Sequence, residues 1–172
     1  MTTPELLADK ITKLASEVEE GIIVELGTFH GRGTIALAKE ARVKLYTIDD
    51  FEEKHGWIGE RYGPEDEEIF WNNVVEAGLQ DKIMHIKMPF EEAAEQWQWD
   101  IGLLYWDPGV VGRFRKDWMD WSGFILVGGI FIAKDTTSGH LGTFGVIQEV
   151  IRNRTWERFD YWQGVSFLRK IR

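Results

Sequence analysis

Residues 22–33, IIVELGTFHGRG, decide the fold of this chain, and residues 34–41, TIALAKEA, complete the pattern. A run of apolar, mostly β-branched residues is followed by three glycines and then by good helix formers, which predicts a strand, a tight loop and a helix. Glycines let such a loop turn sharply and let a ligand approach the backbone ahead of a helix N-terminus, where an anionic group is favoured. The segment therefore opens a βαβ unit and is a candidate binding site.

The same alternation continues outward from this segment. Strands are predicted at 44–48, 83–87, 101–106 and 130–133, and helices before Gly21 and at 65–77, 90–97, 113–121 and 143–152. Strands that alternate with helices indicate a mostly parallel sheet covered by helices on both faces. With no internal linker or repeat in the sequence, we expect one three-layer α/β domain over residues 1–172.

The last third of the chain has its own turn signals. Gly128 and Gly129 are expected to turn the chain into its fifth strand, and Thr143 is expected to cap the last helix. Two aromatic runs, 156–162 and 165–171, flank a Gln-Gly pair, which predicts a terminal antiparallel hairpin.

Composition and charge exclude several classes of function. The 172 residues include no cysteine, which excludes disulfides, thiolate nucleophiles and cysteine-bound metals. The net charge of -9 disfavours nucleic acid as a partner. No apolar run is long enough to span a membrane and no signal peptide is evident, so we expect a soluble, cytoplasmic protein without a membrane partner. An edge strand or some of the nine tryptophans would suffice for a dimer face, which leaves a homo-oligomer open.

Carboxylates follow three of the predicted strands. Asp49 and Asp50 end the second strand, Asp107 the fourth and Asp135 the fifth. Because ligands bind outside the carboxyl ends of the strands in such sheets, these acids are expected to share one rim. Asp49 lies about 20 residues after Gly27, the spacing at which an acid accepts hydrogen bonds from a ribose diol. The loop and Asp49 together predict an adenosine-type ligand.

The glycine spacing narrows the choice of ligand. It reads G-x-x-x-G-x-G and departs from the dinucleotide pattern G-x-G-x-x-G. Short-chain dehydrogenases share the spacing found here, and a resemblance to them would imply a Tyr-x-x-x-Lys pair. None of the four tyrosines is followed by lysine at that distance, so that family is excluded.

The remaining motifs resemble the class I S-adenosylmethionine-dependent methyltransferases. They are Glu25, two places before the first glycine, and the segments YTIDDF at 46–51, LLYWDPG at 103–109 and GGIFIAKDT at 128–136. The resemblance is strongest to the small-domain group of macrocin-type O-methyltransferases and cephalosporin-hydroxylase-like proteins. It implies a Rossmann-like methyltransferase fold with a mostly parallel seven-stranded sheet that ends in an antiparallel hairpin. It also implies methyl transfer from S-adenosylmethionine to a small-molecule acceptor, with oxygen as the favoured target.

The resemblance also implies roles for individual residues. The glycines of the loop and Thr34 would contact the methionine part of the cofactor, Asp49 the ribose, and residues 88–90 would flank the adenine. Asp107 would lie beside the reacting methyl group, and Gly33 stands where the family often has serine. The residues predicted to contact the cofactor are Glu25, Gly27, Thr28, Gly31, Gly33, Thr34, Asp49, Asp50, Phe90 and Asp107.

Asp107 and His140 are the candidate catalytic residues. His140 follows Asp135 on the predicted rim, and the pKa of an imidazole suits a base that takes a proton from a substrate hydroxyl. Relatives often carry Asp-Gly-x-His after the fourth strand, whereas this chain reads Asp-Pro-Gly-Val at 107–110 and has no histidine there. Methyl transfer can also proceed by positioning alone, without a strong base.

A magnesium site is a further hypothesis. Metal-dependent relatives resemble one another in supplying several adjacent oxygen ligands, and Asp107 and Asp135 are available for Mg²⁺ here. Lys134, however, occupies the place of a second acid.

Two alternatives stay open at this point. The sequence WDPG only half matches the N/D-P-P-Y/F motif of amino-methylating relatives, which leaves a nitrogen acceptor open. The altered region after Asp107 also fits a non-catalytic module that binds adenosyl ligands or serves in an assembly.

Residues 51–68 are predicted to be irregular before the helix at 65–77 and are a candidate substrate lid.

Overall fold

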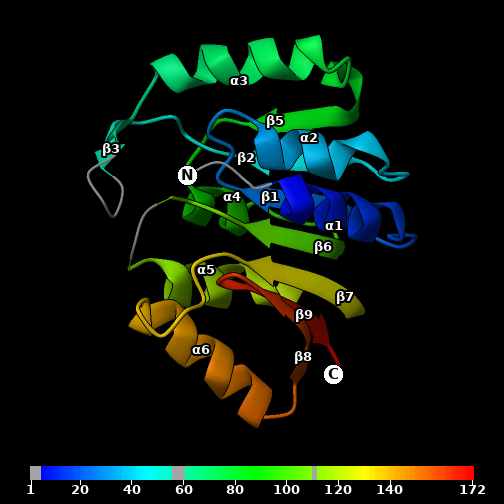
Figure 1. Ribbon diagram of the computed structural model, residues 1–172, viewed down its shortest axis with the longest axis vertical. Helices are drawn as coiled ribbons and strands as arrows, with labels where there is room; N and C mark the ends of the chain where they lie inside the picture. The colour runs from blue at the N-terminus through cyan, green and yellow to red at the C-terminus, as the bar shows by residue number, and fades with distance from the viewer. Residues whose placement is uncertain (1–4, 56–60, 110–111) are drawn as a thin grey trace.

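A computed structural model describes residues 5–55, 61–109 and 112–172 (Figure 1). The helices are α1 (Glu5–Ser16), α2 (Arg32–Lys39), α3 (Glu65–Glu76), α4 (Phe90–Glu95), α5 (Phe114–Trp121) and α6 (Leu141–Arg152), with short 3₁₀ turns η1 (Gln80–Lys82) and η2 (Ser122–Phe124). The strands are β1 (Ile22–Leu26), β2 (Leu45–Ile48), β3 (Lys54–His55), β4 (Arg61–Tyr62), β5 (Ile83–Ile86), β6 (Ile101–Trp106), β7 (Ile125–Ala133), β8 (Trp156–Trp162) and β9 (Val165–Lys170).

The central sheet has seven strands in the order β5-β2-β1-β6-β7-β9-β8 (Figure 1). The first five of these strands run parallel, and β9 pairs antiparallel with both β7 and β8. This confirms the predicted mostly parallel sheet with a terminal hairpin. The strand order reverses between β1 and β6, and ligands of such sheets bind in the crevice at that point.

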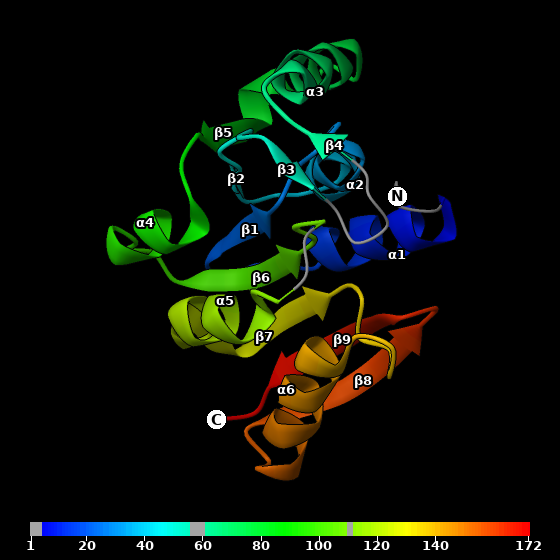
Figure 2. The same ribbon diagram turned by 90° about the vertical axis from the view of Figure 1, so that its left-hand side faces the viewer.

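Helices cover both faces of the sheet and make the fold three-layered (Figure 2). Apolar side chains of α1, α2 and α3 pack with Ile23 and Leu103 on one face, and those of α4, α5 and α6 pack with Val24 and Leu104 on the other. Neighbouring residues of a strand point to opposite faces, so β1 and β6 must be apolar at almost every position. This explains why both strands were visible in the sequence as continuous apolar runs.

Two element boundaries differ from the sequence prediction. Gly128 and Gly129 lie inside β7, which begins at Ile125, and not in a turn before a strand. Gly128 has φ +86° at a register shift between β6 and β7, so the pair forms a bulge within the strand. Helix α6 begins at Leu141 with His140 as its N-cap residue, and Thr143 is buried inside the helix and does not cap it.

Residues 51–68 were expected to be irregular, but part of the segment is ordered as the small antiparallel pair of β3 and β4. Residues 56–60 of the candidate lid lie outside the described residues. Within the described part of the chain, no helix has the length and apolar character needed to cross a membrane.

Candidate functional site

A pocket lies at the carboxyl ends of β1, β2 and β6, where the strand order predicts a binding crevice. Of the residues predicted to contact a cofactor, those that line it are Glu25, Gly27, Thr28, Gly33, Asp49, Phe90 and Asp107. Gly31, Thr34 and Asp50 lie next to this set in the chain but do not line the pocket themselves. The spacing in the sequence therefore brings seven of the predicted residues to one pocket, and their contact with a cofactor stays a prediction.

Gly27 sits where the first loop presses against the end of β6. Its φ is +90°, and a Cβ atom there would lie 2.4 Å from the Asp107 carbonyl oxygen and 2.6 Å from the Pro108 Cα. The Asp107 N–H donates to the Leu26 carbonyl at 2.9 Å, which holds the two strand ends together. A residue without a side chain is therefore required at this position, because a Cβ would collide with the backbone at the end of β6.

The carboxylate of Asp49 fixes the shape of the glycine loop. Its Oδ2 accepts hydrogen bonds from the Thr28 N–H at 2.9 Å and the Thr28 hydroxyl at 3.2 Å, and its Oδ1 accepts from the Phe51 N–H at 3.2 Å. The Phe29 N–H also donates to Oδ2, at 3.5 Å, so Oδ1, which accepts from Phe51 alone among the described residues, is the oxygen with acceptor capacity left for a ligand. Asp49 is therefore a structural tie as well as a lining residue.

Two aromatic residues of the pocket have a left-handed backbone. Phe29 has φ +46° and Phe51 has φ +52°, and both line the pocket. Such a conformation is uncommon outside glycine and concentrates at binding and catalytic sites. It turns the Phe29 ring between His30, with ring centroids 3.6 Å apart, and Tyr62, with centroids 5.2 Å apart. No pattern in the sequence signals these positive φ angles.

Glu25 is a buried carboxyl group at the base of the pocket, with 1% of the residue exposed. Burial raises its pKa well above the ordinary value of 4.5, although the Thr34 hydroxyl, which donates to Oε2, acts in the opposite direction. A Cβ atom on Gly33 would lie 2.4 Å from Glu25 Oε1 and 2.8 Å from the Tyr105 ring. The close approach of these two side chains explains why glycine stands where the family often has serine.

The raised pKa of Glu25 predicts a specific pH dependence of stability. Between 4.5 and the higher folded pKa, the folded chain holds a proton that the unfolded chain has lost. The free energy of unfolding therefore falls as pH rises, by up to about 1.4 kcal/mol per pH unit from this group. Urea denaturation from pH 5 to pH 8 should show a shallower fall for Glu25→Gln than for the wild type. Parallel pH profiles would contradict the burial of a titrating carboxyl at this site.

Asp107 also lines the pocket, and its carboxylate is paired with the ammonium of Lys134. Its Oδ2 accepts hydrogen bonds from Lys134 Nζ at 2.8 Å and from the Tyr105 hydroxyl at 3.2 Å. Burial raises the pKa of Asp107, and the neighbouring ammonium of Lys134 lowers it. This side chain is the only candidate catalytic residue that lines the pocket within the described part of the chain.

His140 and Asp135 are not brought to the pocket wall. His140 is the residue that precedes α6, its N–H donates to the Thr137 carbonyl at 2.9 Å, and it is not among the lining residues. Its catalytic role stays a prediction. Asp135 has φ +55° and does not line the pocket either. Among the residues described, no group of three or more His, Asp or Glu side chains is arranged to hold a metal ion, so the Mg²⁺ hypothesis gains no support.

Several lining residues were missed in the sequence. Arg113 has no assigned role in the sequence analysis, yet it lines the pocket, with its guanidinium 4.2 Å from the centroid of the Phe90 ring. It donates to both carboxylate oxygens of the buried Asp117, at 2.8 and 3.1 Å from Nε, and to Glu91 at 3.0 Å. The spacing of Arg113 and Asp117, four residues apart in a predicted helix, was the available signal.

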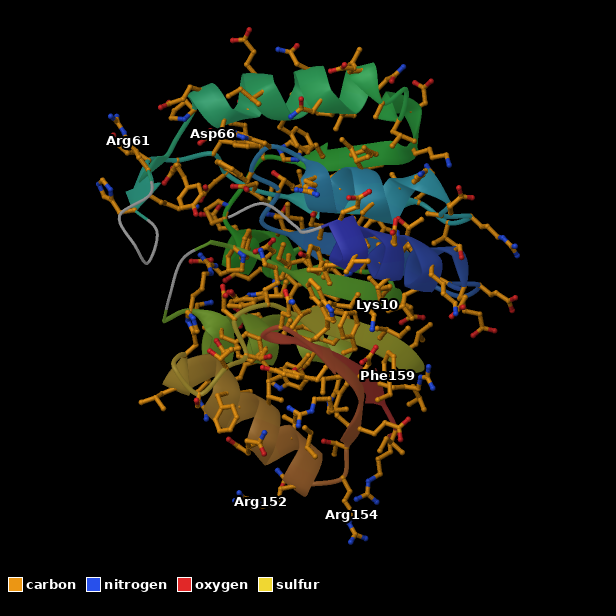
Figure 3. The ribbon with its side chains drawn as sticks, viewed as in Figure 1. Lys10, Arg61, Asp66, Arg152, Arg154 and Phe159 are labelled. Atoms are coloured by element: carbon orange, nitrogen blue, oxygen red, sulfur yellow. The ribbon has the colours of Figure 1, made fainter. Side chains whose placement is uncertain are left out.

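The charged residues at the start of α3 and at the end of α6 lie far apart (Figure 3). Asp66 lies at the start of α3, lines the pocket and is 2.7 Å from His30 Nε2 through its Oδ1 (Figure 3). Arg152 and Arg154 lie together at the far end of α6, away from Asp66 (Figure 3). The basic residues near the end of the chain therefore do not contribute to this pocket.

Comparisons with known proteins agree with this geometry. A family model described as a methyltransferase domain matches residues 24–136. Cofactor-bound Rv0187 from MTB is similar over 99% of this chain and 82% of that chain, with 14% identity and a TM-score of 0.79. The O-methyltransferase TomG from Streptomyces achromogenes, in complex with SAM, is similar over 98% and 81%, with 13% identity and a TM-score of 0.74. SAH-bound methyltransferase PaMTH1 from Podospora anserina is similar over 99% and 80%, with 12% identity and a TM-score of 0.74.

No curated protein matches the sequence. At these identities the solved structures establish the shared fold, whereas the family model matches well over half of the chain. The chain thus belongs to the methyltransferase-domain family and has the class I S-adenosylmethionine-dependent methyltransferase fold.

Proposed function

We propose that the protein transfers a methyl group from S-adenosylmethionine to an oxygen atom of a small-molecule acceptor. The observation that carries the proposal is the pocket at the carboxyl ends of β1, β2 and β6, which is lined by the glycine loop and by the carboxyl groups of Glu25, Asp49 and Asp107. Glycine at position 27 lets the loop pack directly on the end of β6, because a Cβ there would lie 2.4 Å from the Asp107 carbonyl oxygen. Family membership supports methyl transfer, and oxygen as the target is supported by neighbours named O-methyltransferases, such as TomG.

The residues present fit this cofactor. Asp49 would accept hydrogen bonds from the ribose hydroxyls, and the Phe90 ring, backed by Arg113, would lie against the adenine. The loop that begins at Gly27 leads into the first turn of α2, which contains Gly33, and would receive the methionine carboxylate there. When bound, the cofactor supplies an electrophilic methyl group on a positively charged sulfur.

The chain's own contribution is electrostatic and positional. Asp49 places a carboxylate at the wall of a site for a cationic ligand, which favours its binding, whereas the carboxylate of Asp107 is paired with Lys134. Phe29, Phe51 and Tyr62 border the same space and would exclude water from the reacting atoms. Holding an acceptor oxygen in line with the methyl group can supply much of the rate without further chemistry.

Replacing Asp49 tests the ribose contact. Asp49→Ala should weaken binding of S-adenosylhomocysteine by about 10- to 150-fold, because it removes charged hydrogen bonds worth roughly 1.5 to 3 kcal/mol. Asp49→Asn keeps an oxygen that can accept from the Thr28 N–H, so it separates loop distortion from loss of the ribose contact. The matched control is Asp120→Ala, which removes an acid paired with Lys116 on α5. Unchanged affinity in both Asp49 variants, measured by calorimetry, would refute the ribose assignment.

The choice of oxygen requires identification of a product. We would incubate the protein with isotopically labelled S-adenosylmethionine and a panel of phenols, carboxylic acids, alcohols and amines, and locate the label by mass spectrometry. An O-methyl product is the expected result. A product methylated only at nitrogen would contradict the oxygen assignment, and tight cofactor binding without turnover on any acceptor would favour the non-catalytic module.

A further inference from the structure

Lys134 follows β7 directly and lies beside the pocket residue Asp107, at the place where metal-dependent relatives have a second acid. Its Nζ lies 2.8 Å from Asp107 Oδ2, and the Tyr105 hydroxyl donates to the same oxygen at 3.2 Å. The Lys134 side chain is only 13% exposed and that of Asp107 19% exposed. A fixed positive charge therefore stands directly behind a lining carboxylate of the pocket.

The Lys134 ammonium has more N–H donors than acceptors among the described residues. A lysine carries three N–H donors, and the hydrogen bonds among the described residues give Lys134 one acceptor, Asp107 Oδ2. A largely buried cation with remaining N–H groups gains considerably from an additional anionic or strongly accepting partner. Lys134 is not among the described lining residues of the pocket, but its ammonium is one hydrogen bond away from the carboxylate of Asp107, which does line it.

The same ammonium competes with a divalent cation. A metal ion bound to Asp107 Oδ2 would lie within a few ångströms of the Lys134 charge, and like charges at that separation repel strongly in a partly buried site. The carboxylate that was expected to bind Mg²⁺ thus already has a cation, supplied by the chain.

We propose that the Lys134 ammonium binds the acceptor oxygen in its anionic form and thereby selects acceptors with an acidic hydroxyl group, such as phenols. The inference rests on the proposed function. The acceptor hydroxyl loses its proton to bulk water on binding, and the resulting oxygen anion is held by an N–H of Lys134. That oxygen then forms the bond to the methyl carbon as the carbon–sulfur bond breaks, and the electron pair stays on the sulfur. No divalent cation is required for this arrangement.

The ionisation of a bound phenol provides a test that does not depend on turnover. The probe is 4-nitrophenol, whose ionised form absorbs visible light, titrated against pH in the presence of protein saturated with S-adenosylhomocysteine. In the wild type we expect the pKa of the bound probe to fall by about 1 to 3 units relative to free probe, as an opposite charge at close range requires. Addition of Mg²⁺ or of a chelator should leave this shift unchanged.

Variants of Lys134 test whether its ammonium causes the pKa shift of the bound probe. Lys134→Met should abolish the shift, and Lys134→Arg, which keeps a cation beside Asp107, should retain most of it. The matched control is Lys116→Met, which removes an exposed lysine on α5 that pairs with Asp120. Circular dichroism and S-adenosylhomocysteine binding would establish that each variant is folded, and Lys134→Arg remains informative if Lys134→Met does not fold.

The other outcomes overturn the proposal. They are a probe that does not bind the wild-type complex, a shift that persists in Lys134→Met, a shift that Lys134→Arg abolishes in a folded protein, or binding that requires Mg²⁺. Each of these leaves the proposed function standing as long as S-adenosylhomocysteine still binds the wild type. Failure of that cofactor binding would instead contradict the proposed function itself.

Discussion

Replacing Gly27 with alanine is expected to lower the free energy of unfolding by about 2 to 5 kcal/mol and to abolish binding of S-adenosylhomocysteine. The added Cβ would lie 2.4 Å from the Asp107 carbonyl oxygen, and a φ of +90° is strained for any residue with a side chain. Both strand ends would have to separate to relieve the contact. Since Gly27 and Asp107 both line the pocket, its walls would move together with the backbone.

Gly78→Ala is the matched control for this effect. Gly78 also has a positive φ, +67°, but a Cβ there would meet no atom within 4 Å. Its substitution should cost only about 1 to 2 kcal/mol, the penalty of the left-handed backbone alone, and should leave cofactor affinity unchanged. Urea denaturation and calorimetry of both variants would check the comparison. Equal losses at the two positions would show that the approach of β1 to β6 is not what requires glycine.

Arg113→Ala should lower the free energy of unfolding by about 3 to 5 kcal/mol, because it leaves a buried carboxylate without its partner. Asp117 is 2% exposed and accepts from Arg113 Nε at 2.8 Å and from Trp106 Nε1 at 2.8 Å. Burial already raises the pKa of Asp117, and removal of the guanidinium would raise it further. The substitution also removes the cation from the Phe90 ring in the pocket, so cofactor affinity should fall with stability.

Arg115→Ala is the matched control on the same helix. Arg115 pairs with Glu149 at 3.0 Å, but both side chains are more than half exposed, at 61% and 54%. Such surface pairs contribute about 0 to 1 kcal/mol. Adding Asp117→Ala to Arg113→Ala should recover part of the lost stability, because the unpaired charge is then gone. A loss for Arg113→Ala no larger than that for Arg115→Ala would contradict the account of a buried pair.

The fold was predictable because its signals are local. The strand before Gly27 and the helix after it can be recognised from a dozen consecutive residues, and the hairpin from one Gln-Gly pair. Gly128 and Gly129 were misassigned because a glycine pair has the same signature in a turn and in a bulge. Only the register of β7 against β6 distinguishes the two, and register depends on residues distant in sequence.

The site was predictable to the extent that it depends on backbone spacing. Gly27, Asp49 and Asp107 follow strands, so their positions on the rim are set by the sheet. The direction of a side chain beyond the end of its strand depends on the residues that it contacts in the folded chain. Lys134 reaches Asp107 from the end of the neighbouring strand, and His140 precedes a helix outside the pocket wall; neither placement has a local signal.

The most direct test of the central claim is a calorimetric titration of the folded wild-type protein with S-adenosylhomocysteine. The pocket formed by the glycine loop, Asp49 and Asp107 predicts one site per chain with micromolar affinity, about -8 kcal/mol, and competition by S-adenosylmethionine. The absence of binding, in protein shown by circular dichroism to be folded, would contradict the assignment of this pocket to the methyl donor.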